Sequence, residues 1–213
     1  TAAFGLPLIQ LADPSESFTQ ALVISPTREL ANQICGDLAG FARFKKGLRI
    51  EAVYGGTSIL HQIRALKRGV QVVVATPGRA LDLIRRGELK LDHIRYVVLD
   101  EADEMLNMGF LPDIDAILAE TPSERQTLLF SATMPTAIAK LARRYMQNPA
   151  EIQTSERNSG SEHITHEYYQ VQARDRFEAL TRIIALANDF YGIVFCRTRR
   201  NTRDVARKLT KQG

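Results

Sequence analysis

Two adjacent carboxylates, Asp100 and Glu101, follow directly on an apolar run at 96–99. Such a run is typical of a buried strand, and successive residues at a strand end point in different directions. One carboxylate can therefore hold Mg²⁺ while the other positions a water molecule that attacks a phosphate. The structural alternative is that the pair caps a following helix, because acidic side chains interact favourably with the positive end of the helix dipole.

Short apolar runs predict the strands that position this pair. They are rich in β-branched and aliphatic residues and lie at 21–25, 50–53, 70–75, 96–99 and 128–130. Their near-continuous apolar character is typical of a parallel sheet that is covered on both faces. Helical patterns, with apolar residues three or four positions apart, lie between and after them at 29–41, 58–67, 111–118 and 136–145. This alternation predicts an α/β fold with a doubly wound parallel sheet.

Each predicted strand ends in a group of polar residues or glycines. These groups are Ser25 to Glu29, Tyr54 to Gly56, Thr76 to Arg79, Asp100 to Asp103 and Ser131 to Thr133. Ligands of open α/β sheets bind beyond the carboxyl ends of the strands. The sequence therefore predicts that one edge of the sheet carries the active site.

The order of these groups resembles that of the motifs of the DEAD-box RNA helicases. Asp100-Glu101-Ala102-Asp103 spells the signature of that family. The other matching segments resemble its motif Ia (Pro26 to Ala31), its paired glycines (Gly55-Gly56), motif Ib (Thr76 to Arg79), motif III (Ser131 to Thr133) and motif IV (Val194 to Cys196). The resemblance covers essentially the whole chain. It implies a RecA-like doubly wound sheet followed by the start of a second RecA-like domain.

The resemblance also implies what the motif II and motif III residues do. ATP and Mg²⁺ are the implied cofactors. Asp100 is expected to coordinate Mg²⁺ through water, and Glu101 to act as general base for the hydrolytic water. Asp103 is expected to contact motif III, where Ser131 and Thr133 couple the state of ATP to movement of the two domains. Ser131 and Thr133 could also cap the helix that follows them, which would not exclude coupling.

Three of the motifs are expected to hold the backbone of RNA, the implied partner. Their residues are Pro26, Thr27, Arg28, Gly55, Gly56, Thr76, Pro77, Gly78 and Arg79. Glycines let main-chain N–H groups approach phosphates, and arginines supply charge-assisted contacts. Backbone contacts carry no sequence information, so we expect largely sequence-independent binding. Simpler alternatives exist: Arg28 could pair with Glu29 or Asp100. The segment Thr76-Pro77-Gly78 could be only a turn that starts a helix, and Gly55-Gly56 could be a plain turn.

The ends of the sequence depart from the family pattern. Thr1-Ala2-Ala3-Phe4 resembles the end of a phosphate-binding loop and the start of the helix after it. Thr1 is then the expected second Mg²⁺ residue beside Asp100, acting through water. The lysine of that loop, the adenine-recognition element and the arginine-rich string of the family's second domain are not in the sequence. We therefore expect a chain truncated at both ends that hydrolyses ATP poorly by itself.

A polar stretch rich in Gly and Ser divides the sequence. We predict a first RecA-like domain at 1–157, a linker at 158–164, and the N-terminal part of a second RecA-like domain at 165–213. The pattern after the linker predicts strands at 166–171 and 192–195 and helices at 176–187 and 202–209.

The composition narrows the class of function only slightly. Lys and Arg outnumber Asp and Glu by 28 to 24, for a net charge of +4, which weakly favours a nucleic-acid partner. No apolar run approaches the ~20 residues of a membrane-spanning helix. Cys35 and Cys196 are far apart and lack metal-ligand spacing, which fits a reducing compartment. We expect a cytoplasmic monomer without membrane contact.

The leading hypothesis is an ATP-dependent RNA helicase that unwinds short duplexes or remodels ribonucleoprotein. Two other functions stay open. An RNA-binding module without ATP turnover would bind RNA in the absence of nucleotide. A DNA-directed helicase of the same superfamily would be activated by DNA, although the Asp-Glu-Ala-Asp string argues against it.

Overall fold

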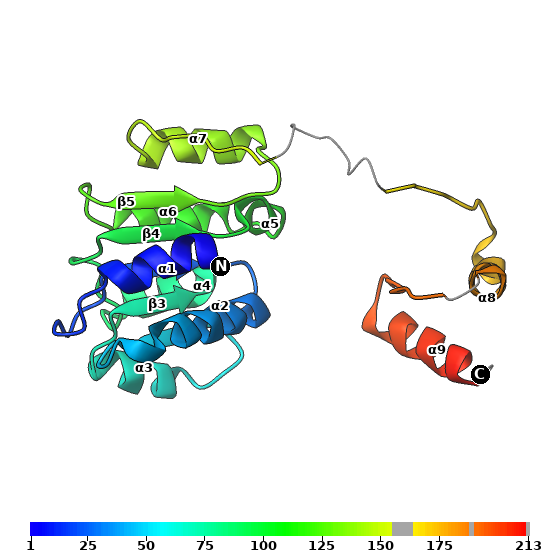
Figure 1. Ribbon diagram of the computed structural model, residues 1–213, viewed down its shortest axis with the longest axis horizontal. Helices are drawn as coiled ribbons and strands as arrows, with labels where there is room; N and C mark the ends of the chain where they lie inside the picture. Colours follow the sequence, from blue (N-terminus) through cyan, green and yellow to red (C-terminus); the bar gives the residue numbers. More distant parts are fainter. Residues whose placement is uncertain (155–163, 188–189, 212–213) are drawn as a thin grey trace. The chain divides into compact units, whose positions relative to one another are not determined.

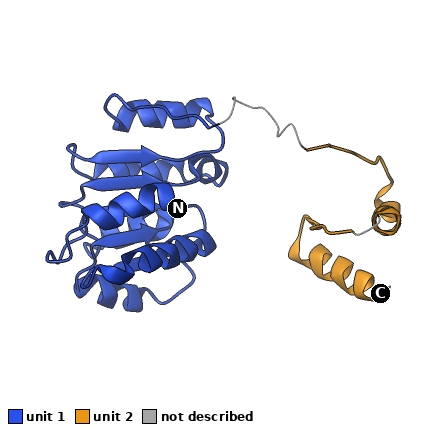
Figure 2. Ribbon diagram, viewed as in Figure 1, with its two compact units in different colours: residues 1–158 blue, residues 159–213 orange. Residues whose placement is uncertain are grey.

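The computed structural model describes residues 1–154, 164–187 and 190–211. The chain divides into two compact units, residues 1–158 and 159–213 (Figure 2). The linker predicted at 158–164 lies outside the described residues except for Ile164. The first unit contains every residue that the sequence assigns to the catalytic, metal and RNA sites.

The first unit is built on a sheet of five parallel strands (Figure 1). They are β1 (Ala21–Ile24), β2 (Ile50–Val53), β3 (Val72–Ala75), β4 (Tyr96–Leu99) and β5 (Gln126–Leu129). The spatial order is β2-β3-β1-β4-β5, so the chain completes one side of β1 before it crosses to the other. The predicted doubly wound sheet is confirmed, with strand ends that differ from the predicted ones by at most two residues. Ligands of such sheets bind where the winding reverses, which here is at β1 and β4.

Helices cover both faces of the sheet, because the strands are apolar on both sides. One face is covered by α1 (Ala2–Leu11) and α2 (Arg28–Phe41). The other is covered by α3 (Ile59–Lys67), α4 (Pro77–Arg85), α5 (Ala102–Asn107), α6 (Leu111–Ala119) and α7 (Thr136–Tyr145). Ala21 and Val23 pack in the first layer, whereas Leu22 and Ile24 pack in the second. This alternation is the period of two that a strand requires.

Ser25, directly after β1, is a polar residue in this core. It is completely buried, and its Oγ has no hydrogen-bond partner among the described residues. A buried polar group without a partner costs about 1–3 kcal/mol. We expect Ser25→Ala to raise the free energy of unfolding by about 1 kcal/mol in urea denaturation. Ser58→Ala, at an exposed position where the hydroxyl caps nothing, is the control; a lower midpoint for Ser25→Ala than for wild type contradicts the prediction.

The described part of the second unit contains two α-helices, α8 (Arg176–Leu186) and α9 (Arg199–Thr210), as predicted. Helix α9 begins three residues earlier than predicted, because Thr198 Oγ1 accepts a hydrogen bond from the Asn201 N–H at 3.1 Å. The predicted strands at 166–171 and 192–195 are absent from the described part of this unit. A strand needs a hydrogen-bonded neighbour, and no described segment of this unit supplies one. In neither unit is any described helix long and apolar enough to cross a membrane.

Candidate functional site

The predicted functional groups lie along one edge of the sheet. The strands end level with one another, in the order Val53, Ala75, Ile24, Leu99 and Leu129. The ladder continues past this row, since the Asp100 N–H donates to the Ile24 carbonyl at 2.9 Å and the Phe130 N–H to the Leu99 carbonyl at 2.8 Å. The groups that follow the strands therefore begin side by side, as the topology predicts.

Glu101 occupies the turn between β4 and α5 with a backbone conformation that favours glycine. Its φ of 52° and ψ of 53° are left-handed, which costs a non-glycine residue about 1–3 kcal/mol. Glu101 is at the N-cap position of α5. Every residue of this helix is described, and the Glu101 side chain accepts no hydrogen bond from its N–H groups. Capping therefore does not account for Glu101, and its side chain is exposed at the sheet edge.

Burial and neighbouring charges set the protonation of the carboxylate pair. Burial raises the pKa of Asp100, whereas a backbone hydrogen bond at Glu101 opposes this rise. Burial also raises the pKa of Glu101, and the negative charges of Asp100, Asp103 and Glu104 raise it further. Both carboxylates are thus stronger bases than usual, which suits Asp100 for holding a cation and Glu101 for accepting a proton.

The same edge fits Mg²⁺ bound together with a nucleotide. The described residues contain no group of three or more His, Cys, Asp or Glu side chains that could enclose a metal. Mg²⁺ at nucleotides needs fewer protein ligands, because it keeps several waters and binds phosphate oxygens besides one or two carboxylates. Half-buried Asp100 supplies a carboxylate, and Thr1 is the N-cap of α1, a helix end that favours phosphate.

Hydrogen bonds join Asp103 to motif III. Asp103 Oδ2 accepts from the Thr133 N–H at 2.9 Å and from the Thr133 hydroxyl at 2.7 Å. Burial favours the neutral form of Asp103, but the hydrogen bonds with Thr133, Ser131 and Glu104 outweigh it and lower its pKa. Asp103 is therefore held as a carboxylate and ties the start of α5 to the segment after β5.

Ser131 and Thr133 do not cap α7, the helix that follows them. Its N-cap is Pro135, which makes no side-chain cap hydrogen bond. Instead, Ser131 Oγ accepts from the Asp103 N–H at 3.1 Å and donates to the Thr133 carbonyl at 2.6 Å. The Phe130 carbonyl accepts from the Ala102 N–H at 3.0 Å. The capping alternative is thus wrong about the helix, because the Phe130 carbonyl and Ser131 Oγ accept from the first N–H groups of α5.

The motif Ia residues begin α2 and reach the glycine loop, defined as residues 54–57. Thr27 caps α2, since its Oγ1 accepts from the Leu30 N–H at 3.2 Å. Arg28 forms the predicted alternative pair with Glu29, with Nε and Oε1 2.6 Å apart and both side chains exposed. The φ of Gly56 is +80°, and a Cβ there would lie 3.5 Å from Arg28 Nη1. The structure thus brings the exposed Arg28 beside the glycine loop. Pro26, in contrast, is buried.

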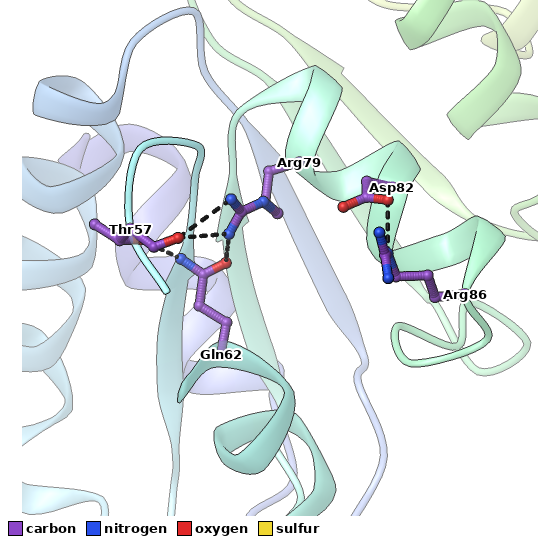
Figure 3. Close-up of polar contacts among 5 residues, drawn as sticks. All are labelled: Thr57, Gln62, Arg79, Asp82 and Arg86. Atoms are coloured by element: carbon purple, nitrogen blue, oxygen red, sulfur yellow. Dashed lines mark hydrogen bonds and ion pairs between the residues drawn. The ribbon is translucent and has the colours of Figure 1, made fainter. Parts of the chain in front are cut away.

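The motif Ib segment is the start of α4, as its structural alternative states. Thr76 is the N-cap, Pro77 is in the first turn, and Gly78 is exposed. Arg79 turns towards the glycine loop: its Nη2 donates to the Thr57 carbonyl at 3.3 Å (Figure 3). The exposed Asp82–Arg86 pair on the same helix, at 2.7 Å, has the geometry of a surface ion pair that contributes little.

Sequence reasoning missed Gln62, which meets both Arg79 and the glycine loop (Figure 3). It lies on α3 between Ile59, Ile63 and Leu66, which pack against the core. The signal that could have found it is a polar residue on the apolar stripe of a helix, since a buried amide needs hydrogen-bond partners.

The chain is similar to known proteins over its whole length. The pattern of the DEAD/DEAH box helicase family matches residues 1–141. The chain is 47% identical over its whole length to the DEAD-box ATP-dependent RNA helicase CshA of Streptococcus pneumoniae, of which it covers 40%. It is 46% identical to the ATP-dependent RNA helicase DeaD of Haemophilus influenzae, of which it covers 35%. The chain thus spans less than half the length of these relatives.

A solved structure has the same fold. The crystal structure of a DEAD box protein from the hyperthermophile Methanococcus jannaschii is 42% identical and superposes with a TM-score of 0.68, over all of this chain and 56% of that one. The parallel sheet is therefore RecA-like, as the sequence resemblance implied. By its motifs, its sheet and these relatives, the chain belongs to the DEAD/DEAH box helicase family.

Proposed function

We propose that the protein to which this chain belongs is an ATP-dependent RNA helicase. In this proposal it hydrolyses ATP with Mg²⁺ and uses the energy to separate short RNA duplexes or to remodel RNA–protein complexes. The observation that carries the proposal is that two carboxylates with different roles lie at the same edge of the sheet. Glu101 does not cap α5 and is exposed as a base, whereas Asp103 is hydrogen-bonded to Thr133 of motif III. Relatives at 46–47% identity that are named ATP-dependent RNA helicases support it.

The residues of the edge divide the hydrolysis between them. Glu101 accepts a proton from a water molecule, whose oxygen attacks the terminal phosphorus as the bond to the ADP oxygen breaks. Asp100 and Thr1 are the residues that would hold a magnesium ion there, through water. When bound, that ion neutralises phosphate charge. The side chain of Glu101 is exposed and does not cap α5, so that it can meet the water.

The RNA backbone is proposed to lie along the glycine loop and the starts of α2 and α4. Gly55 and Gly56 are exposed and permit close approach of their N–H groups to phosphate. Arg28 is exposed beside the loop and adds positive charge. Such contacts read shape rather than base sequence. We further propose that the protein works in the cytoplasm as a monomer, where its free thiols Cys35 and Cys196 are compatible with a reducing environment.

The test compares RNA and DNA of the same sequence as activators of ATP hydrolysis by the full-length protein. Strong stimulation by RNA and little by DNA is expected. Equal stimulation by DNA favours a DNA-directed helicase instead. RNA binding without any nucleotide turnover favours an RNA-binding module, and either result overturns the proposed function.

A further inference from the structure

We infer that Gln62 is a positioning residue for the RNA-binding edge, a role that rests on the proposed binding of RNA. Its amide joins the glycine loop to Arg79 at the start of α4. It therefore fixes two RNA-binding segments relative to each other, although Gln62 belongs to none of the motifs found in the sequence.

The hydrogen bonds of Gln62 explain why a polar side chain is only 4% exposed. Its Nε2 donates to the Tyr54 carbonyl at 3.1 Å and to Thr57 Oγ1 at 2.9 Å. Its Oε1 accepts from Arg79 Nη1 at 2.7 Å (Figure 3). Both amide protons are thus used, and a charged donor occupies the oxygen, so the partners on each side fix which way the amide faces.

These bonds order a loop whose own residues give it little rigidity. Gly55 and Gly56 have no side chains to pack, and glycine loses more conformational entropy on ordering than any other residue. A loop that is ordered in advance binds its ligand at a lower entropic cost. The bonds from Gln62 and Arg79 use oxygens of Tyr54 and Thr57. They therefore order the loop without using its N–H groups, which are the groups that donate to a phosphate.

The same geometry gives Arg79 a second role. Its side chain is half-buried and donates to Gln62 and to the Thr57 carbonyl. The guanidinium is thus a tie between α4 and the glycine loop, besides being a charge near RNA. Gln62 receives the shortest of its bonds and holds the guanidinium in this orientation.

The test is the RNA dependence of ATP hydrolysis by the full-length protein carrying Gln62→Leu. Leucine fills the buried space but removes all three hydrogen bonds. We expect the RNA concentration for half-maximal stimulation to rise about tenfold or more, with turnover at saturating RNA unchanged. The matched control is Gln10→Leu, an exposed glutamine of α1, which should behave like wild type. An unchanged RNA requirement for Gln62→Leu overturns the inference.

A second variant and a second measurement separate positioning from folding. Gln62→Glu keeps the acceptor for Arg79 but loses the donors to the Tyr54 carbonyl and to Thr57 Oγ1, so an intermediate RNA requirement is expected. If Gln62→Leu lowers the melting temperature, the Glu variant becomes the test. A raised RNA concentration for half-maximal stimulation in that variant supports the inference, and a wild-type concentration overturns it. If the wild-type protein shows no RNA stimulation, the proposed function fails. Faster amide exchange at 55–58 in Gln62→Leu then still supports the tie, and unchanged exchange overturns it.

Discussion

Replacing Glu101 with glutamine is expected to lower RNA-stimulated ATP hydrolysis by the full-length protein about 100- to 10,000-fold, the contribution of a general base. Binding of ATP and RNA is expected to persist, because glutamine keeps the size of the side chain and the neighbouring groups are unchanged. The side chain of Glu101 caps nothing on α5, so the substitution removes a base and leaves the helix start intact. The measurement is steady-state turnover beside equilibrium binding of both ligands.

The pH dependence of turnover gives an independent check on the same residue. Burial, then the charges of Asp100, Asp103 and Glu104, raise the pKa of Glu101. A base works only when it is deprotonated, so turnover should fall as the pH drops through this raised pKa. The fall should therefore occur at a higher pH than for an ordinary glutamate, and Glu101→Gln should abolish it.

Glu104→Gln is the matched control, because Glu104 is an exposed glutamate one turn away. It should leave turnover at neutral pH close to that of wild type. Because Glu104 contributes least to the raised pKa, its removal should move the acid side of the profile only slightly, towards lower pH. Undiminished turnover in Glu101→Gln would show that the carboxylate pair is structural.

The sheet and its functional edge could be predicted because both depend on local patterns. The run Tyr96 to Leu99 is apolar at every position, which is typical of a strand covered on both faces, and Asp100 follows it directly. Parallel strands end at the same edge, so the polar groups after them had to meet. The prediction of strands in the second unit was wrong because strand formation also depends on contacts that are not local. An apolar run gives a strand only where a neighbour pairs with it, and the pattern of a segment does not contain its neighbour.

The connections between the motifs could not be predicted, because they join residues far apart in sequence. Ser131 meets α5 rather than α7 because Phe130 pairs with Leu99, which places motif III beside the first turn of α5. Arg79 meets Gln62 because the two helices that follow β2 and β3 start side by side. A motif in the sequence indicates which residues matter for chemistry. It does not indicate which of them face the ligand and which hold the others in place.

Thr133→Val is expected to lower RNA duplex unwinding by the full-length protein about tenfold or more, while ATP hydrolysis changes only a few-fold. Valine matches threonine in shape but removes the 2.7 Å hydrogen bond from the hydroxyl to Asp103 Oδ2. A hydrogen bond to a charged group contributes about 1.5–3 kcal/mol, which is roughly a 10- to 100-fold change in an equilibrium. The bond lies between motif II and motif III and does not involve Glu101, so its loss should affect coupling more than chemistry. Thr136→Val, at an exposed position three residues later, is the control.

A double-mutant cycle shows whether the effect passes through Asp103. In Asp103→Asn, the partner of Thr133 loses its charge, so adding Thr133→Val should cost little more than Asp103→Asn alone. Additive losses would mean that the two residues act separately. A parallel fall of unwinding and hydrolysis in Thr133→Val would place the hydroxyl in the chemistry instead. If coupling depends on the bond, the ratio of duplexes unwound to ATP hydrolysed should fall with either substitution and fall little further with both, because each weakens or removes the same hydrogen bond between the Thr133 hydroxyl and Asp103.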